Sequence, residues 1–258
     1  YHAETVAVYP GDKNHLPYDV VIQTLRTNEP EPPAPAAEPE KTPDEVLDEH
    51  PISIQVNGQW QTFPNARAAE EASYEEYKAN LRRTAENFRI TDDHLGEGGP
   101  KAKFQANIAA IKLLKYLEET TEQATPEQQK ILSRYVGWGG LADAFDPEKP
   151  AWAAEYTQLK ELLTPEEYTA ARGSTLNAHY TSPTVIRAIY EAVGRMGFET
   201  GNILEPSCGV GNFFGMLPEK MRNSRLYGVE LDSISGRIAK QLYPKADITV
   251  AGFETTDR

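Results

Sequence analysis

Three short apolar segments, separated by amphipathic stretches, occupy the last third of the chain. Their pattern predicts strands at residues 202–205, 225–230 and 247–250, a helix after each of the first two, and another helix after Pro183. The order β-α-β-α-β is typical of a doubly wound α/β domain with a parallel sheet. The buried face of the helix after Pro183 is expected to contain Val185, Ile186, Ile189, Tyr190 and Val193.

A helical region precedes these strands, from about Ala66 to Arg172. Thr125 and Thr164 are each followed at once by Pro and, three positions after the Thr, by an amide or an acid. This pattern marks the start of a helix. The apolar residues at helical spacing that should contribute to the core are Tyr74, Tyr77, Leu81, Phe88, Phe104, Ile108, Ile111 and Leu114.

Two glycine clusters interrupt the helical region, at residues 96–100 and 137–140. We interpret them as a helix end and a tight turn. The alternative is a flexible loop in which Trp138 covers a ligand or stacks on a base.

The first 66 residues are predicted to be short β elements joined by a linker. Residues 1–27 contain two β-like runs, which we expect to belong to a preceding module. Six Pro residues among Glu and Ala make residues 28–45 an extended linker. In residues 46–66, alternating apolar positions beside Asn57-Gly58 predict a hairpin with a type I′ turn. The predicted domains are thus 1–27, 28–45, 46–66, 67–172 and 173–258.

Charge is distributed unevenly along the 258 residues. The formal net charge is −13, and residues 173–258 contain nine Lys and Arg and nine Asp and Glu. Residues 1–172 contain 17 basic and 30 acidic residues. An acidic chain attracts phosphate backbones weakly, so a nucleic-acid substrate would need other parts of a longer protein to bind it.

Composition excludes several classes of protein and site. No run of about 18 apolar residues is present, which excludes a transmembrane helix. The single cysteine, Cys208, excludes an internal disulfide framework, fits a reducing cytoplasm, and is interpreted as a small loop residue. The five histidines lack metal-ligand spacing, so we expect no metal site. The first residues show neither Met nor a signal pattern, and we expect the chain to be part of a longer protein.

The turn after the first predicted strand has the chemistry of a ligand site. Glu205 ends that strand, and Gly209 and Gly211 follow where a side chain would keep a ligand away from the backbone. Glu230 ends the second strand and can accept hydrogen bonds from both hydroxyls of a ribose. The pattern therefore predicts a site for an adenosine-type cofactor.

Two features favour S-adenosylmethionine over NAD as that cofactor. The next glycine, Gly215, comes too late for the dinucleotide pattern G-x-G-x-x-G. The carboxylate of Glu205 would repel a pyrophosphate, but it suits the ammonium group of a methionine moiety.

Three motifs carry a resemblance to a known family. Residues 205–213, Glu-Pro-Ser-Cys-Gly-Val-Gly-Asn-Phe, resemble the cofactor-binding motif of the amino-group DNA methyltransferases. Residues 228–232 resemble their second motif, with Glu230 on the ribose and Leu231 against the adenine. Residues 179–183 resemble the Tyr/Phe-Thr-Pro element that closes over the methionine end of the cofactor in the N6-adenine subgroup.

This resemblance implies a Rossmann-like, S-adenosylmethionine-dependent DNA adenine-N6 methyltransferase. The implied cofactor-binding residues are Tyr180, Thr181, Ser182, Glu205, Pro206, Gly209, Gly211, Phe213, Glu230, Leu231 and Phe253. The sequence departs from the family pattern in three respects. One residue is inserted in Thr181-Ser182-Pro183 relative to Thr-Pro, so the cofactor contact could be Thr181 or Ser182. Gly252 stands where an Asp usually binds the adenine amino group. The catalytic Asn/Asp-Pro-Pro-Tyr/Phe motif is absent, so we expect this chain to stop before it and to be inactive alone.

A narrower resemblance involves the helical region. Residues 90–99 and 135–141 resemble the large methylase–helicase proteins of bacterial conjugative elements and phages, in which a methylase-like domain precedes a helicase module. Two alternatives remain open: a non-catalytic methylase-like module for binding or scaffolding, and an RNA or protein methyltransferase.

Overall fold

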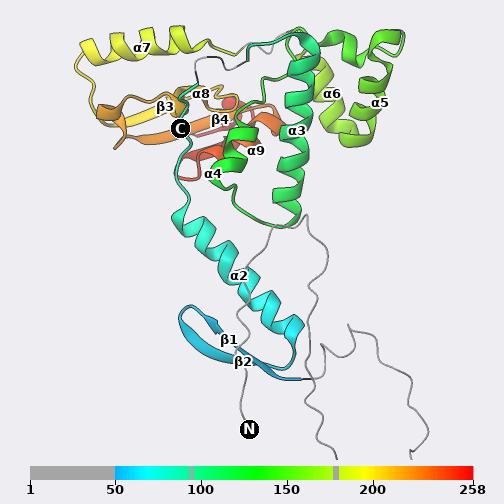
Figure 1. Ribbon diagram of the computed structural model, residues 1–258. Coiled ribbons are helices and arrows are strands. Elements are labelled where there is room, and N and C mark those ends of the chain that lie inside the picture. The colour runs from blue at the N-terminus through cyan, green and yellow to red at the C-terminus, as the bar shows by residue number, and fades with distance from the viewer. Residues whose placement is uncertain (1–49, 93, 95, 177–179, 258) are drawn as a thin grey trace, which may run out of the picture. The chain divides into compact units, whose positions relative to one another are not determined.

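A two-stranded hairpin, a series of helices and a three-stranded parallel sheet follow one another along the chain (Figure 1). The computed structural model describes residues 50–257 except 93, 95 and 177–179. The predictions for residues 1–27 and 28–45 lie outside the described residues. The described part is thus of mixed α/β composition, with its parallel strands at the C-terminal end.

The hairpin consists of β1, Ile52–Val56, and β2, Gln59–Phe63, which pair antiparallel. Asn57 and Gly58 both have positive φ, as a type I′ turn requires. Helix α2, Ala66–Thr84, packs on both strands.

Phe88 does not belong to α2, contrary to the prediction that grouped it with Tyr74, Tyr77 and Leu81. The helix ends at Thr84, and the backbone N–H of Phe88 donates to the carbonyl of Leu242 instead. Periodic spacing alone could not show that the chain leaves the helix before this residue.

The helical region continues with four α-helices and two short 3-10 helices. Thr125 and Thr164 each form a complete capping box, so both predicted helix starts are confirmed. Phe104, Ile111 and Leu114 are fully buried. The elements are α3 Pro100–Glu119, α4 Pro126–Leu132, η1 Ala142–Phe145, η2 Pro150–Trp152, α5 Ala153–Leu162 and α6 Pro165–Ser174.

The parallel sheet has the strand order β3-β4-β5, and its strands occupy the predicted residues. The strands are β3 Asn202–Glu205, β4 Arg225–Glu230 and β5 Asp247–Val250. The connecting elements are α8 Asn212–Gly215, η3 Glu219–Met221 and α9 Ser233–Leu242, and η4 Phe253–Thr255 follows β5.

Helices α8 and α9 cover the same face of the sheet. A Cβ added at Gly228 would lie 3.2 Å from the Phe214 ring of α8, and one added at Gly236 of α9 would lie 2.8 Å from Val250. This arrangement is expected when two successive right-handed β-α-β connections each add the next strand on the same side of the preceding one. The carboxyl ends of β3 and β4, where the predicted site residues lie, are therefore adjacent.

Helix α7, Pro183–Arg195, is less buried than predicted. Ile186 and Tyr190 are buried, but Val185 and Ile189 are 48% and 42% exposed. The prediction was wrong for these two residues because α7 packs through a narrow stripe, with Tyr190 against Phe213.

Helix α9 joins the helical region to the sheet (Figure 1). It packs on β4 and β5 and also contacts α3 and α4. Its Arg237 forms ion pairs with Glu118 and Glu167, and its Gln241 side chain accepts a hydrogen bond from the Ala124 amide. One hydrophobic core therefore extends from the helical region into the sheet. Among the described residues, no helix is long and apolar enough to cross a membrane.

Candidate functional site

The loop after β3 turns sharply through two glycines with left-handed backbone. Gly209 has φ 55° and Gly211 has φ 83°, which L side chains rarely adopt. A Cβ at Gly211 would also lie 2.4 Å from the Tyr243 ring. Glycine is needed at position 215 for a different reason, because a Cβ there would lie 2.6 Å from the Ile90 side chain. The first two glycines shape the loop, and the third lets the segment after α2 pack closely.

The carboxylate of Glu230 holds this loop against the end of β4. Its Oε2 accepts a hydrogen bond from the Gly209 amide at 2.7 Å, and its Oε1 accepts one from the Asp232 amide at 2.8 Å. The residue is only 8% exposed. An ionised carboxylate has further lone pairs, so hydroxyl groups of a ligand can still bind to it.

Asp232 has a structural role as the N-cap of α9. Its Oδ2 accepts a hydrogen bond from the Ser235 amide at 2.9 Å and another from the Ser235 hydroxyl. This fixes the turn that follows Glu230.

Glu205 is the second carboxylate at the loop, and it is half-buried at the end of β3. Burial raises its pKa, and no cationic side chain among the described residues offsets the effect. An uncompensated carboxylate in this position favours a cationic ligand.

The Cys208 thiol is buried near these two carboxylates. Burial, together with the charges of Glu230 and Glu205, raises its pKa to about 12. A thiol that stays protonated is a poor nucleophile, which agrees with the interpretation of Cys208 as a small loop residue.

Tyr180 lies directly over the glycine loop. A Cβ added at Gly209 would lie 3.0 Å from its ring, and its hydroxyl lies 3.1 Å from the Ser235 hydroxyl. Thr181 and Ser182 are exposed, and the Ser182 hydroxyl accepts a hydrogen bond from the Val185 amide at the start of α7. Among Tyr180, Thr181 and Ser182, the residue that contacts the glycine loop is therefore Tyr180.

The remaining predicted site residues differ in exposure. Leu231 is 77% exposed and Phe253 is 46% exposed, so both present apolar surface beyond the ends of β4 and β5. Pro206 is exposed. The Phe213 ring packs edge-on against Tyr190 at the start of the loop's helix, and its carbonyl accepts a hydrogen bond from the Tyr190 hydroxyl at 2.8 Å.

A carboxylate lies beside Gly252, although residue 252 itself has none. The Glu254 Oε1 lies 2.2 Å from the place where a Cβ of residue 252 would stand. Sequence comparison position by position misses this acid, since it comes from two residues further along the chain.

Trp138 is not a ligand-facing residue. Its side chain is 1% exposed and packs edge-on against Phe104, Tyr135 and Phe145. The interpretation of residues 137–140 as a tight turn is confirmed, because the Leu141 amide donates a hydrogen bond to the Trp138 carbonyl at 2.9 Å. The ring is too buried to stack on a base.

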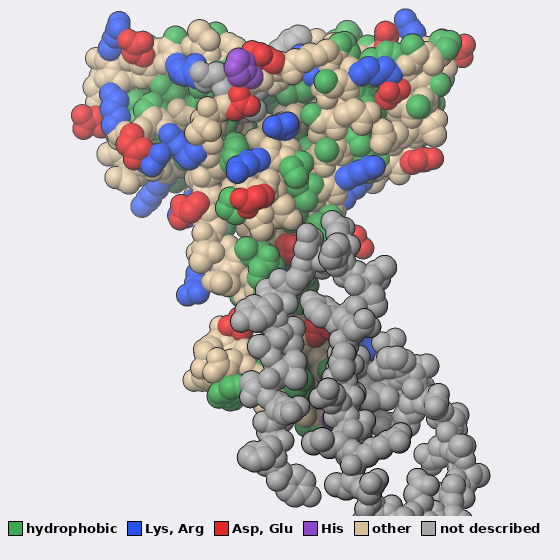
Figure 2. Space-filling model, viewed as in Figure 1, with side chains coloured by type: hydrophobic (Ala, Val, Ile, Leu, Met, Phe, Trp, Pro, Cys, Tyr) green, Lys and Arg blue, Asp and Glu red, His purple; other side chains and the backbone are tan. Residues whose placement is uncertain are grey.

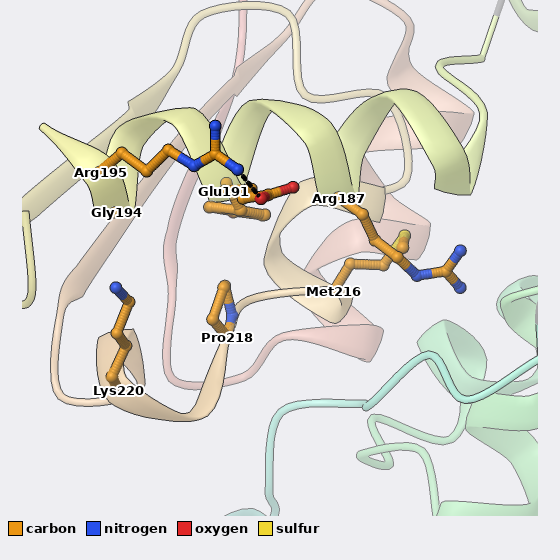
Figure 3. A pocket seen from close by; sticks show the side chains of 8 residues that line it. Arg187, Glu191, Gly194, Arg195, Met216, Pro218 and Lys220 are labelled. Carbon is orange, nitrogen blue, oxygen red and sulfur yellow. Dashed lines mark hydrogen bonds and ion pairs between the residues drawn. The ribbon is translucent and has the colours of Figure 1, made fainter.

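A shallow groove of about 440 Å³ lies along α7 (Figure 3). It is formed by the last turns of α7 and the segment before β4, and its charged residues include Arg187, Arg195 and Lys220. Arg195 pairs with Glu191 on the same helix. The groove reaches the helix that follows the glycine loop, because its lining also includes Tyr190, whose hydroxyl binds the Phe213 carbonyl, and Met216, the residue after α8. No group of three or more His, Cys, Asp or Glu able to hold a metal ion occurs among the described residues.

Two curated proteins match the chain. It is 26% identical over 159 residues to Defense against restriction protein B of Escherichia phage P1, a match that covers 62% of this chain and 6% of the phage protein. It is 37% identical over 78 residues to Type II methyltransferase M.CvrRI of Paramecium bursaria Chlorella virus XZ-6E, covering 30% of this chain and 20% of that protein.

The chain is of a methylase-related kind. It spans only a small part of the length of either relative. No protein-family model matches the chain, and no solved structure matches it.

Proposed function

We propose that residues 173–258 are the cofactor-binding part of a Rossmann-like, S-adenosylmethionine-dependent DNA adenine-N6 methyltransferase. The arrangement of Glu205, the Gly209–Gly211 turn and Glu230 at adjacent strand ends supports this proposal. The match to a type II methyltransferase supports it independently. When bound, the cofactor supplies a methyl group on a sulfonium centre.

Each residue of the site has a distinct proposed role. Glu230 binds the ribose hydroxyls, and Glu205 binds the amino group of the methionine moiety. Leu231 and Phe253, whose exposed side chains lie beyond the strand ends, bind the adenine ring. Tyr180 closes the loop from above, and Glu254 supplies the acid that residue 252 lacks.

The uncompensated charge of Glu205 is the observation that carries the choice of cofactor. A half-buried carboxylate with a raised pKa disfavours the pyrophosphate of a dinucleotide, since two anions would then meet in a partly desolvated site. A cationic amino group removes that penalty. The charge of Glu205 therefore favours S-adenosylmethionine over a dinucleotide.

DNA as the substrate rests on the resemblance of the motifs. On the face that Figure 2 shows, Lys and Arg side chains alternate with Asp and Glu over the described residues. The net charge of −13 also gives little attraction to phosphates. We propose that further parts of a longer protein bind the DNA.

A second candidate is a methylase-like module that binds cofactor or partner without transferring methyl. Gly252, in place of the usual Asp, favours it, whereas the carboxylate of Glu254 beside Gly252 weakens that reason.

Calorimetric titration of the chain tests the cofactor assignment. We expect heat of binding with S-adenosylhomocysteine and none with NAD. Glu230→Gln should weaken binding at least about tenfold, because one amide-anchored anion is lost. The control is Glu191→Gln, which changes an exposed acid paired with Arg195 and should leave affinity unchanged. Preference for NAD, or equal affinity in the Glu230 variant, would refute the assignment.

A further inference from the structure

The ring of Tyr180 is held between two glycines from distant parts of the chain. A Cβ at Gly209 would lie 3.0 Å from its Cε1, and a Cβ at Gly137 would lie 2.7 Å from its Cε2. These carbons are on opposite edges of the ring. Gly209 belongs to the loop after β3, and Gly137 belongs to the turn after α4. The ring of Tyr180 therefore connects the helical region to the candidate site.

The turn at Gly137 is fixed by a buried side chain. Asn107 of α3 is fully buried, and its amide nitrogen donates to the Gly137 carbonyl at 2.6 Å. Its amide oxygen accepts from the Val136 amide at 2.9 Å. Trp138, next in the chain, is locked among aromatic rings. A turn held at three successive residues is a rigid support.

The hydroxyl end of Tyr180 is also anchored. It lies 3.1 Å from the Ser235 hydroxyl, which is bound to the Asp232 carboxylate. Tyr135, from the same turn as Gly137, is almost fully buried beside this group. Burial raises its pKa well above the usual value, and Tyr180 and Asp232 raise it further. The two tyrosines, Ser235 and Asp232 thus form one polar cluster beside the loop.

We propose that the turn Tyr135–Trp138 of the helical region is a positioning element of the cofactor site. It seats Tyr180 on Gly209, and Gly209 in turn donates the hydrogen bond that orients Glu230. The helical region is therefore part of the site that binds the adenosine-type cofactor, and the sheet alone is incomplete. This inference rests on the proposed function, and it assigns a role to a turn that the cofactor motifs do not include.

Two glycine variants of the same segment test the proposal. Gly137→Ala and Gly140→Ala both place a side chain at positive φ, 67° and 74°, and so share the same kind of backbone strain. Only the first drives a Cβ into Tyr180, because nothing lies within 4 Å of a Cβ at Gly140. By calorimetry with S-adenosylhomocysteine, we expect Gly137→Ala to weaken binding about tenfold or more and Gly140→Ala to change it less than about twofold.

A double variant shows whether the effect passes through Tyr180. In a Tyr180→Ala background, Gly137→Ala should cause no further loss of affinity, since the ring that it displaces is gone. Equal losses in the two glycine variants, or a full additional loss in the Tyr180→Ala background, would overturn the proposal.

The unfolding free energy distinguishes a failure of this inference from a failure of the proposed function. If the unaltered chain binds no S-adenosylhomocysteine, the proposed function fails. The contact between Gly137 and Tyr180 is then tested by the free energy of unfolding of the same variants, measured with denaturant. If the loss of unfolding free energy in the double variant differs from the sum of the losses in the two single variants, the contact is supported. If the losses are additive, the contact is contradicted.

Discussion

The backbone amide of Gly209 donates a hydrogen bond to the Glu230 carboxylate at 2.7 Å, which ties the loop after β3 to the end of β4. This contact joins the two motifs that the sequence separates by a helix. It also means that a ligand on Glu230 is bound to a residue already oriented by the loop.

Affinity for the cofactor product should depend on pH through Glu205. Burial raises the pKa of this carboxyl, and a cationic amino group binds only the ionised form well. The affinity for S-adenosylhomocysteine should therefore increase as pH rises through the raised pKa, and then level off. Titrations between about pH 5 and about pH 8 measure it. In Glu205→Gln the affinity should be lower and flat over this range, and a retained increase would assign the titration to another group.

The same carboxyl should affect stability with the opposite sign. The folded chain holds the Glu205 proton more tightly than the unfolded chain does. Protonation of Glu205 therefore contributes its full stabilisation at pH values below the carboxyl pKa of the unfolded chain. This contribution is lost as pH rises through the raised pKa. Denaturant unfolding at several pH values should show a smaller loss for Glu205→Gln than for the unaltered chain, and equal losses would contradict the assignment.

Leu231 and Phe253 should contribute to binding without contributing much to folding. Both side chains are exposed, so alanine at either position removes little buried surface from the free chain. We expect each change to weaken S-adenosylhomocysteine binding about fivefold, equivalent to about 1 kcal/mol of lost apolar contact. The matched control is Met196→Ala, because Met196 is 84% exposed but follows α7 at the opposite end of the strands. A loss in the control as large as in the site variants would show that the adenine does not bind between them.

Glu254 should contribute to recognition of the adenine amino group. Its carboxylate lies beside Gly252, at the end of β5. Glu254→Gln should weaken S-adenosylhomocysteine binding about threefold to tenfold, as expected for the net contribution of one hydrogen bond. The control is Glu219→Gln, which changes an exposed acid paired with Arg222 away from the loop. Unchanged affinity in Glu254→Gln would leave the second candidate function favoured.

The strands and the helix starts were predictable because they depend on local patterns. Alternating or continuous apolar runs define β3 to β5, and Thr125 and Thr164 signal their helices through adjacent residues. The proximity of Gly209 and Glu230 also followed, since parallel strands bring their carboxyl ends together.

Contacts between distant segments were not predictable. No local signal connects Gly137 with Tyr180, or Glu254 with the acid missing at Gly252. The apolar pattern of α7 identified one face of the helix but could not show how much of that face is covered, so Val185 and Ile189 were wrongly predicted to be buried.

The 258-residue chain should not transfer methyl groups by itself. Methyl transfer to an exocyclic amine needs a base held out of the stack and an acceptor for its amino hydrogens. The sequence contains no Asn/Asp-Pro-Pro-Tyr/Phe motif to supply them. An assay with labelled methyl donor on duplex and single-stranded DNA should remain at background. Clear turnover would mean that the catalytic residues lie elsewhere in this chain and that the substrate differs from an adenine base.

The most direct test of the cofactor site is an NMR titration of the ¹⁵N-labelled chain with S-adenosylhomocysteine. The account predicts that the amides of Gly209, Gly211 and Asp232 shift in a saturable way, together with those beside Phe253. The amides of η3 around Lys220, which precede the start of β4, should not shift. Saturable shifts confined to η3, or no shifts at the Gly209–Gly211 turn, would contradict the account.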